Sequence, residues 1–189
     1  MERNTQRQSA GRGRLGSAAG SALFFAAAPA VVAGLVPWLL TGWRMDTPVS
    51  WWGVLRWAGV VPTAAGGLVL VSAFARFVLE GIGTPAPVAP TRHLVVGGLY
   101  RYVRNPMYIA VVAAILGQAL LLGRAELVVY AVVAGAVMVA FARCVEEPQL
   151  LSRFGAEYAR YRRDVPGWRP RLQAWTSPPP QGASGEELR

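Results

Sequence analysis

The sequence predicts an all-α integral membrane protein with about four transmembrane helices and a cytoplasmic amphipathic helix near its C-terminus. Its residues are 53% hydrophobic and 15% charged, a composition too apolar for an ordinary soluble domain of this size. Four apolar segments have about the length that crosses the hydrocarbon core of a bilayer. Arginines lie mainly outside these segments, as expected for loops and tails at membrane edges.

Each expected span has its own signals. Pro29 and Pro37 should bend the first span, because proline cannot continue the helical hydrogen-bond ladder. Gly59, Gly66 and Gly67 in the second are small enough for a neighbouring helix to approach closely. The third and fourth spans are short and joined by a brief turn, which indicates a helical hairpin. The expected spans are residues 22–40, 57–79, 107–122 and 127–142.

The arginines also predict orientation. All 19 basic residues are arginine, and only Arg44, Arg56 and Arg124 fall on one side of the expected bundle, against sixteen on the other. The positive-inside rule then places both termini and the long middle loop in the cytoplasm, for a multi-pass protein of the inner (plasma) membrane. Because the net charge of +9 follows the membrane edges, we expect no nucleic-acid partner.

The domain is expected at residues 21–172, with a disordered basic tail at 1–20 and a disordered C-terminal tail at 173–189. Residues 147–163 have apolar side chains at helical spacing. Pro148 suits the first turn of such a helix. We expect this amphipathic helix to lie on the cytoplasmic leaflet or to cap the bundle there. Its apolar face would consist of Leu150, Leu151, Phe154, Tyr158 and Tyr161.

The middle loop begins with Gly81-Ile82-Gly83-Thr84. Glycines at these positions allow either a close backbone approach to a ligand or a helix C-cap. Leu94-Val95-Val96 further along is a short β-like run. Taken alone, the glycine pair fits either role.

Two polar clusters flank the third and fourth spans. The first runs from Tyr100 to Tyr108, and the second is Glu146-Glu147. Tyrosines and arginines are common at membrane interfaces, so the first cluster alone also fits simple anchoring. Two adjacent glutamates at a bilayer edge repel one another unless a cation is near. That cation is either Arg104 or Arg101, in a structural ion pair, or the cationic part of a bound cofactor.

Several classes of site are not expected. His93 is the one histidine and has no partners at metal-ligand spacing, and the one cysteine, Cys144, forms no internal disulfide. The sequence has no nucleophile elbow, no Walker-type phosphate loop and no complete dinucleotide-binding fingerprint. We therefore expect no metal, and neither a hydrolase nor a soluble nucleotide-binding fold.

Four motifs together resemble the isoprenylcysteine carboxyl methyltransferase family and, more distantly, the phospholipid N-methyltransferases. The resemblance covers roughly residues 53–170. The motifs are Gly81-x-Gly83-Thr84-Pro85, Tyr100-Arg101-Tyr102-x-Arg104-Asn105-Pro106-x-Tyr108, Glu146-Glu147-Pro148-x-Leu150 and Phe154-Gly155-x-x-Tyr158-x-x-Tyr161-x-x-x-Val165-Pro166.

The resemblance implies an S-adenosylmethionine-dependent methyltransferase whose cofactor lies in a cytoplasmic-side pocket. Arg104 is the candidate for orienting the substrate, with Arg101 as second choice. Asn105 departs from the family, because many members have histidine there, which favours binding over proton transfer. Gly167-Trp168 departs where a basic residue is common. The implied cofactor-binding residues are Gly81, Gly83, Thr84, Tyr100, Asn105, Pro106, Tyr108, Glu146 and Glu147.

The leading functional hypothesis is methylation of a carboxylate on a lipid-soluble acceptor, as in isoprenylcysteine O-methylation. A carboxylate is ionised at neutral pH and needs no general base. The alternatives are N-, O- or S-methylation of a phospholipid or other small molecule, a nicotinamide-dependent membrane reductase, and a non-catalytic membrane protein. Small residues on the second span permit association, but the sequence sets no oligomeric state.

Overall fold

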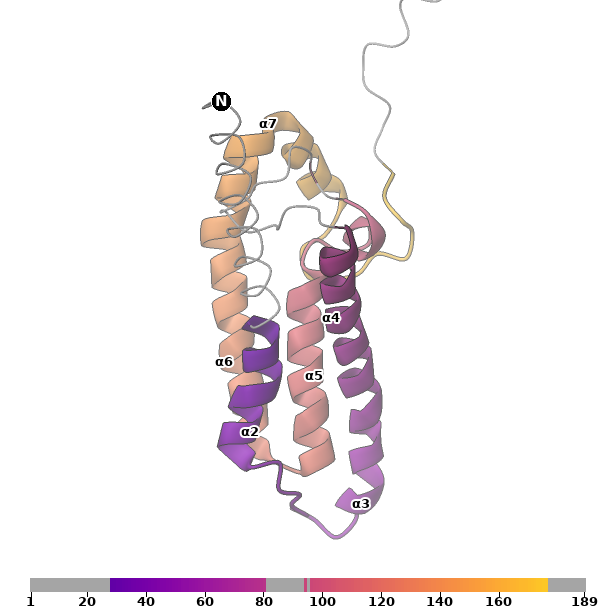
Figure 1. The fold of residues 1–189 in the computed structure, drawn as a ribbon, viewed down its shortest axis with the longest axis vertical. Coiled ribbons are helices and arrows are strands. Elements are labelled where there is room, and N and C mark those ends of the chain that lie inside the picture. Colours follow the sequence, from indigo (N-terminus) through magenta and orange to yellow (C-terminus); the bar gives the residue numbers. More distant parts are fainter. Residues whose placement is uncertain (1–27, 81–93, 95, 177–189) are drawn as a thin grey trace, which may run out of the picture.

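The computed structural model describes residues 28–80, 94 and 96–176, and this part of the chain is all-helical. Long helices run side by side and alternate in direction (Figure 1). Leu94 and Val96 belong to no strand, so the expected β-like run is wrong; both side chains pack instead on a buried aromatic cluster. The elements are η1 (Val31–Leu35), α2 (Val36–Thr41), α3 (Trp52–Leu55), η2 (Arg56–Gly59), α4 (Val60–Glu80), η3 (Gly98–Arg101), α5 (Pro106–Leu122), α6 (Ala125–Phe141), η4 (Ala142–Glu146) and α7 (Glu147–Asp164).

Two helices of the described chain are long and apolar enough to cross a membrane, Trp52–Ser72 and Ala125–Asp164. Two further apolar helices, Ala28–Thr41 and Pro106–Leu122, are shorter, with 10–17 residues. The structure is therefore consistent with a membrane protein, but the count of four spans is not established by helix length.

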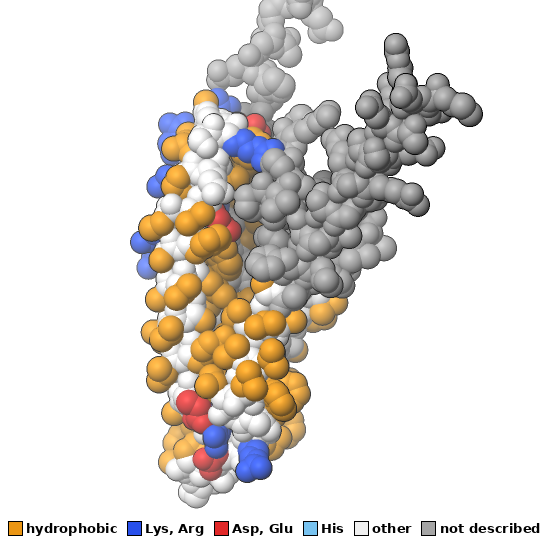
Figure 2. All heavy atoms as spheres, turned by 60° about the vertical axis from the view of Figure 1, so that its left-hand side comes forward, with side chains coloured by type: hydrophobic (Ala, Val, Ile, Leu, Met, Phe, Trp, Pro, Cys, Tyr) orange, Lys and Arg blue, Asp and Glu red, His pale blue; other side chains and the backbone are white. Residues whose placement is uncertain are grey.

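Apolar side chains cover much of the outside of the bundle. Figure 2 shows hydrophobic atoms along the middle of one face, with charged atoms gathered towards its two ends. On α6, Val129, Val132 and Val137 are each more than 60% exposed. The reverse face of α6 contributes Leu127 and Ala131 to a buried core with α5. Such an exterior suits lipid rather than water, because charge is confined to the ends.

Glycines bring α4 and α5 into close contact. A Cβ atom added to Gly66 would lie 2.5 Å from the Ala110 carbonyl oxygen, and one added to Gly117 would lie 2.6 Å from the Thr63 nitrogen. Gly67 has open space around its Cβ position. The expected role of Gly66 is thus confirmed, whereas Gly67 does not serve this contact.

The loop after α2 meets the α5–α6 turn at one end of the bundle. The Asp46 amide donates to the Leu122 carbonyl oxygen at 2.7 Å, and Trp52 Nε1 donates to Leu120 at 3.0 Å. Gly123 ends α5 with a positive φ of 69°. Arg124 pairs with Glu126 at 2.7 Å. This end is distinct from the one where α6 passes into α7 (Figure 1).

The first helix contains a break before its second proline. At η1 the Val36 amide donates to Val31, five residues back, rather than to Val32. Pro37 has no N–H, so it cannot serve the Ala33 carbonyl oxygen as an ordinary helical residue would. Two successive carbonyl groups therefore lose their usual backbone donors. The disturbance expected from Pro37 thus takes the form of a π-turn.

Side chains from neighbouring helices supply the missing donors. The Tyr130 hydroxyl on α6 donates to the Val32 oxygen at 2.9 Å. Gln118 Nε2 on α5 donates to the Ala33 oxygen at 2.7 Å. Because a carbonyl group without a partner is costly in an apolar bundle, these two polar residues stabilise the break.

A second break of the same kind joins α6 to α7. The Glu147 amide donates to Ala142, again five residues back, and Pro148 follows directly. The helix continues through this π-turn, which joins the expected fourth span to the expected amphipathic helix. Single π-turns inside α-helices often mark functional positions.

Candidate active site at the charged end of the bundle

A kink in α7 closes the end of the bundle. Gly155 has φ 49° and ψ −123°, which glycine adopts far more readily than other residues. The helix folds over at this point, as the arch at the end of α6 in Figure 1 shows. Tyr158 and Tyr161 beyond the kink are buried, and the Tyr161 hydroxyl donates to the Tyr100 carbonyl oxygen at 2.7 Å. The predicted amphipathic helix therefore caps the bundle and is not one straight helix.

The chain after α7 packs back onto the same end. Trp175 is buried, and its ring meets that of Tyr161 edge to face at 5.4 Å between centroids. The Trp175 amide donates to the Arg101 carbonyl oxygen at 2.9 Å, and Arg101 Nε donates to the Trp175 carbonyl oxygen at 2.8 Å. The packed chain thus extends to Trp175, beyond the expected start of the tail at residue 173.

Residues 165–175, the C-terminal strap, also hold the start of α5. The Arg104 amide donates to Pro166 at 3.0 Å, and the Asn105 amide donates to Gly167 at 3.2 Å. Asn105 Nδ2 donates to the same Gly167 oxygen at 3.1 Å. Asn105 thereby fixes the strap against the first turn of α5, directly before Pro106.

The centre of the site is an ion pair between Arg104 and Glu147. Arg104 Nη1 donates to Glu147 Oε1 at 2.6 Å, and Glu147 is 8% exposed. Arg104 Nε also donates to the Val165 carbonyl oxygen at 3.0 Å. Arg162, beyond the kink, approaches Glu147 Oε2 with its Nε at 3.4 Å. The structure thus selects Arg104 as the cationic partner of this glutamate.

Glu146 has a separate and less polar environment. The Tyr108 hydroxyl donates to Glu146 Oε1 at 2.7 Å. Burial raises the pKa of the Glu146 carboxyl; the hydrogen bond from Tyr108 acts in the opposite direction, and the charge of Glu147 raises the pKa further. Burial and the Glu146 charge also raise the pKa of the Tyr100 hydroxyl. A cation that approaches Glu146 would therefore stabilise its charged carboxylate.

A cavity of about 530 Å³ opens beside the ion pair. Its volume lies within the usual range of roughly 300–1,000 Å³ for small-molecule sites. Three guanidinium groups and one carboxylate face it, so its wall is net positive. The lining residues are Arg104, Arg143, Glu147, Pro148, Leu151, Arg162, Gly167 and Trp168.

Gly167 and Trp168 shape one wall of this cavity. A Cβ atom at Gly167 would lie 3.1 Å from Arg104 Nη2, so glycine keeps that guanidinium nitrogen uncrowded. The Trp168 ring stacks on Tyr108 at 6.2 Å with 17° between the planes. Gly167 and Trp168, which stand where the resembling family commonly has a basic residue, therefore form part of the cavity wall.

The predicted residues divide by position. Arg104 and Glu147 line the cavity, whereas Tyr108 and Glu146 form a hydrogen-bonded pair beside it. Asn105 and Pro106 position the strap and α5. Arg101, the second choice for holding the substrate, instead donates a hydrogen bond to the strap at Trp175. Gly81, Gly83 and Thr84 lie outside the described residues.

Sequence reasoning missed Arg143 and Arg162 as cavity residues. Arg162 lies fifteen positions after Glu147, a separation that a straight helix would span as roughly 22 Å. Only the kink at Gly155 brings the two together. The motif around Val165 and Pro166 was visible, but nothing in it indicated that the Val165 carbonyl oxygen would accept from Arg104.

An apolar helical bundle with a charged cavity at one end defines a class, that of membrane proteins with a polar site at the bilayer edge. Residues 54–157, more than half of the chain, match the phospholipid methyltransferase family. The chain belongs to this family, which includes the isoprenylcysteine carboxyl methyltransferases. It is accordingly a membrane methyltransferase for a lipid-type substrate. A search of curated proteins gives no match.

The family match bears on the competing hypotheses and on the site. It favours a methyltransferase over a reductase or a non-catalytic protein. The matched residues include Arg104, Arg143 and both glutamates, but end before Arg162 and the C-terminal strap. Three of the eight residues that line the cavity, Arg162, Gly167 and Trp168, thus lie outside the match.

Proposed function

We propose that this protein transfers a methyl group from S-adenosylmethionine to a lipid-soluble acceptor, and that both meet in the cavity beside Arg104 and Glu147. The observation that carries this proposal is the buried Arg104–Glu147 pair at the wall of a 530 Å³ cavity, at one end of an apolar bundle. It is supported by the family to which the chain belongs.

The residues present fit such a cofactor. Glu147 and the adjacent Glu146 are acceptors for its ammonium and ribose hydroxyl groups. A guanidinium of the cavity matches its carboxylate, and Trp168 offers a flat ring face for stacking. Gly167 leaves room beside Arg104. Together these groups offer opposite charges to the two ends of a zwitterion.

The bound cofactor would supply an electrophilic methyl group on a sulfonium. The remaining tasks belong to the chain: to align the acceptor and to exclude water. For a carboxylate acceptor no proton has to be removed, because the acceptor is already ionised at neutral pH. Arg104 Nη2, together with Arg143 or Arg162, would hold that carboxylate. This is the leading assignment of the acceptor.

A phospholipid amine is the second candidate acceptor, and one observation favours it. An ammonium group must lose a proton before it can be methylated, so the site needs a base. Burial raises the pKa of Glu146, which makes this carboxylate a better proton acceptor near neutral pH than an exposed glutamate. At saturating S-adenosylmethionine, methylation of an amine should then disappear in Glu146→Gln, whereas methylation of a carboxylate should continue.

The binding experiment uses purified protein in detergent and S-adenosylhomocysteine as probe. We expect Arg104→Ala and Glu147→Ala each to weaken binding about tenfold or more. Arg169→Ala and Glu157→Ala, which remove exposed charges outside the cavity, are the matched controls. Unchanged binding in both site variants would overturn the site. If the intact protein bound no probe at all, the enzyme assignment would fail.

We further propose that all four apolar helices, the two shorter ones included, cross the plasma membrane with the site in the cytoplasm. α5 has 17 residues, about 25 Å of helix, and lies between α4 and α6 (Figure 1). Cys144 is exposed at the site end and is the one cysteine of the chain. A membrane-impermeant thiol reagent should label it in inverted vesicles but not in intact cells. Labelling from outside would reverse the orientation.

A further inference from the structure

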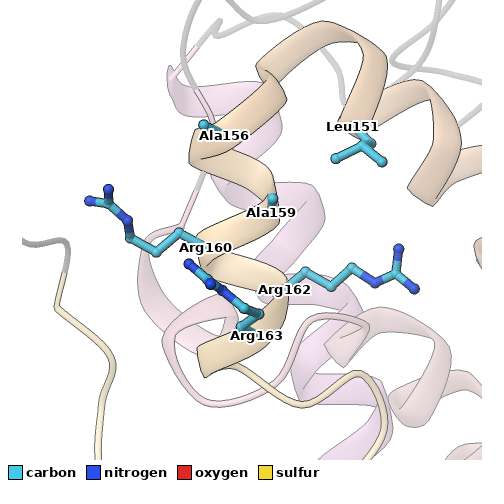
Figure 3. A pocket seen from close by; sticks show the side chains of 6 residues that line it. All are labelled: Leu151, Ala156, Ala159, Arg160, Arg162 and Arg163. Atoms are coloured by element: carbon cyan, nitrogen blue, oxygen red, sulfur yellow. The ribbon is translucent and has the colours of Figure 1, made fainter.

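A second cavity, which we call the outer cavity, lies under the kink of α7. Its volume is about 490 Å³. Figure 3 shows Leu151 on the half of α7 before the kink, facing a helical turn that bears three arginines. The lining residues are Leu151, Ala156, Ala159, Arg160, Arg162 and Arg163.

The outer cavity follows from the helical period after Gly155. Ala156, Ala159, Arg160 and Arg163 recur at three- and four-residue spacing and so share one helix face. The opposite face of the same turns buries Tyr158 and its neighbours. Two alanines on the cavity face leave space that larger side chains would fill. This helical wall thus combines small apolar and basic side chains, and Leu151 lies on the other half of α7.

The charge of this wall is largely unopposed within the described residues. Arg160 and Arg163 have no carboxylate partner in that part of the chain, and no Asp or Glu lines the cavity. Arg162 is 50% exposed, and its contact with Glu147 is 3.4 Å long. The three guanidinium groups spread along the helix rather than converging (Figure 3). They therefore match an exposed anionic head group better than an enclosed phosphate ion.

The outer cavity adjoins the site. Leu151 and Arg162 line both cavities, and Arg162 also contacts Glu147. Because α7 follows directly on the apolar helix α6, this groove lies where lipid head groups begin. A lipid whose head group lay against the arginines would have its glycerol region against Leu151 and the alanines.

We propose that the outer cavity binds the phosphate-bearing head group of an anionic membrane lipid, which presents the acceptor group to the cavity beside Arg104. Presentation of the acceptor group rests on the proposed function, whereas binding of the lipid head group does not. Arg160 and Arg163 select the charge of the lipid, and neither of them lines the cavity beside Arg104. Electrostatic attraction to anionic lipid contributes about fivefold in affinity per arginine near the surface.

The test measures lipid retained by the purified protein, using native mass spectrometry after exposure to equal amounts of phosphatidylglycerol and phosphatidylcholine. The intact chain should retain the anionic lipid preferentially. Arg160→Gln/Arg163→Gln should reduce that preference about tenfold or more, and Arg160→Lys/Arg163→Lys should restore most of it. Each single variant, Arg160→Gln and Arg163→Gln, is compared with Arg169→Gln, which removes an exposed arginine at the same end but outside both cavities.

The outcomes separate this proposal from the proposed function. The outer-cavity assignment is overturned if the glutamine variants and the control variant keep the same lipid preference. It is also overturned if inorganic phosphate is retained as well as the anionic lipid is. S-adenosylhomocysteine binding should be unchanged in Arg160→Gln/Arg163→Gln. A protein that shows the lipid effect but binds no S-adenosylhomocysteine would retain the outer cavity and lose the methyl-transfer site.

Discussion

The two helix breaks of this bundle have the same backbone construction and different surroundings. In each, one amide donates five residues back, and a proline follows: Val36 before Pro37 in the first helix, and Glu147 before Pro148 at the start of α7. At the first break, neutral side chains complete the hydrogen bonds of the backbone. At the second, the residue in the position of Val36 is a glutamate that pairs with Arg104.

The difference shows that location decides what a π-turn can do. Within the apolar bundle, a free carbonyl group has no water to bind, so Tyr130 and Gln118 are needed as donors. At the charged end, the same widening of the helix places Glu146 and Glu147 beside a cavity. One break is therefore expected to serve stability, and the other ligand binding.

The largest expected effect separates the two breaks by ligand affinity. Glu146→Gln should weaken S-adenosylmethionine binding roughly 10- to 100-fold, because hydrogen bonds to a charged partner contribute about 1.5–3 kcal/mol. The glutamine oxygen can still accept from Tyr108, so the local packing is retained. Calorimetry on the purified protein measures this. Gln118→Leu at the first break should leave the affinity unchanged, and an equal loss in both variants would contradict the division.

The second prediction concerns stability at the first break. Gln118→Leu should lower the free energy of unfolding by about 1–2 kcal/mol, because the Ala33 oxygen then loses its donor and Pro37 cannot replace it. The loss is limited because Gln118 Oε1 has no partner within the described structure. Thermal unfolding in detergent gives the comparison. In a Pro37→Ala background the Gln118 substitution should cost less, since an alanine at that position restores a backbone N–H.

The sequence predicted the helices well because their apolar composition and length are local properties. Pro37 indicated that a break would occur, and the paired glutamates indicated that a cation was needed. The donors were not predictable: Gln118 and Tyr130 meet the first helix only through packing over more than 80 residues of sequence separation. Gly155 was likewise noticed within a motif, but its positive φ and the return of α7 depend on the strap and the tyrosines that it buries.

A smaller effect is expected for the other donor at the first break. Tyr130→Phe removes the hydroxyl that serves the Val32 oxygen. The backbone can repair this loss, because a return to α-helical geometry would give Val32 the Val36 amide. We therefore expect a cost of about 0.6 kcal/mol, the average for interhelical hydrogen bonds in membrane proteins. A cost equal to that of Gln118→Leu would show that the π-turn is locked by packing and not by this bond.

The smallest expected effect is the pH dependence that Glu146 gives to stability at the second break. Burial raises the pKa of this carboxyl in the folded protein above its ordinary value of 4.5, so the unfolded chain releases the proton first. The stabilising contribution is complete below pH 4.5, and it declines as the pH rises through the folded pKa. Thermal unfolding of the wild type minus that of Glu146→Gln, recorded against pH, isolates this decline. If this difference in stability instead increased with pH, the folded protein would favour the charged carboxylate. A cation would then neighbour Glu146 even without ligand, as Arg104 neighbours Glu147.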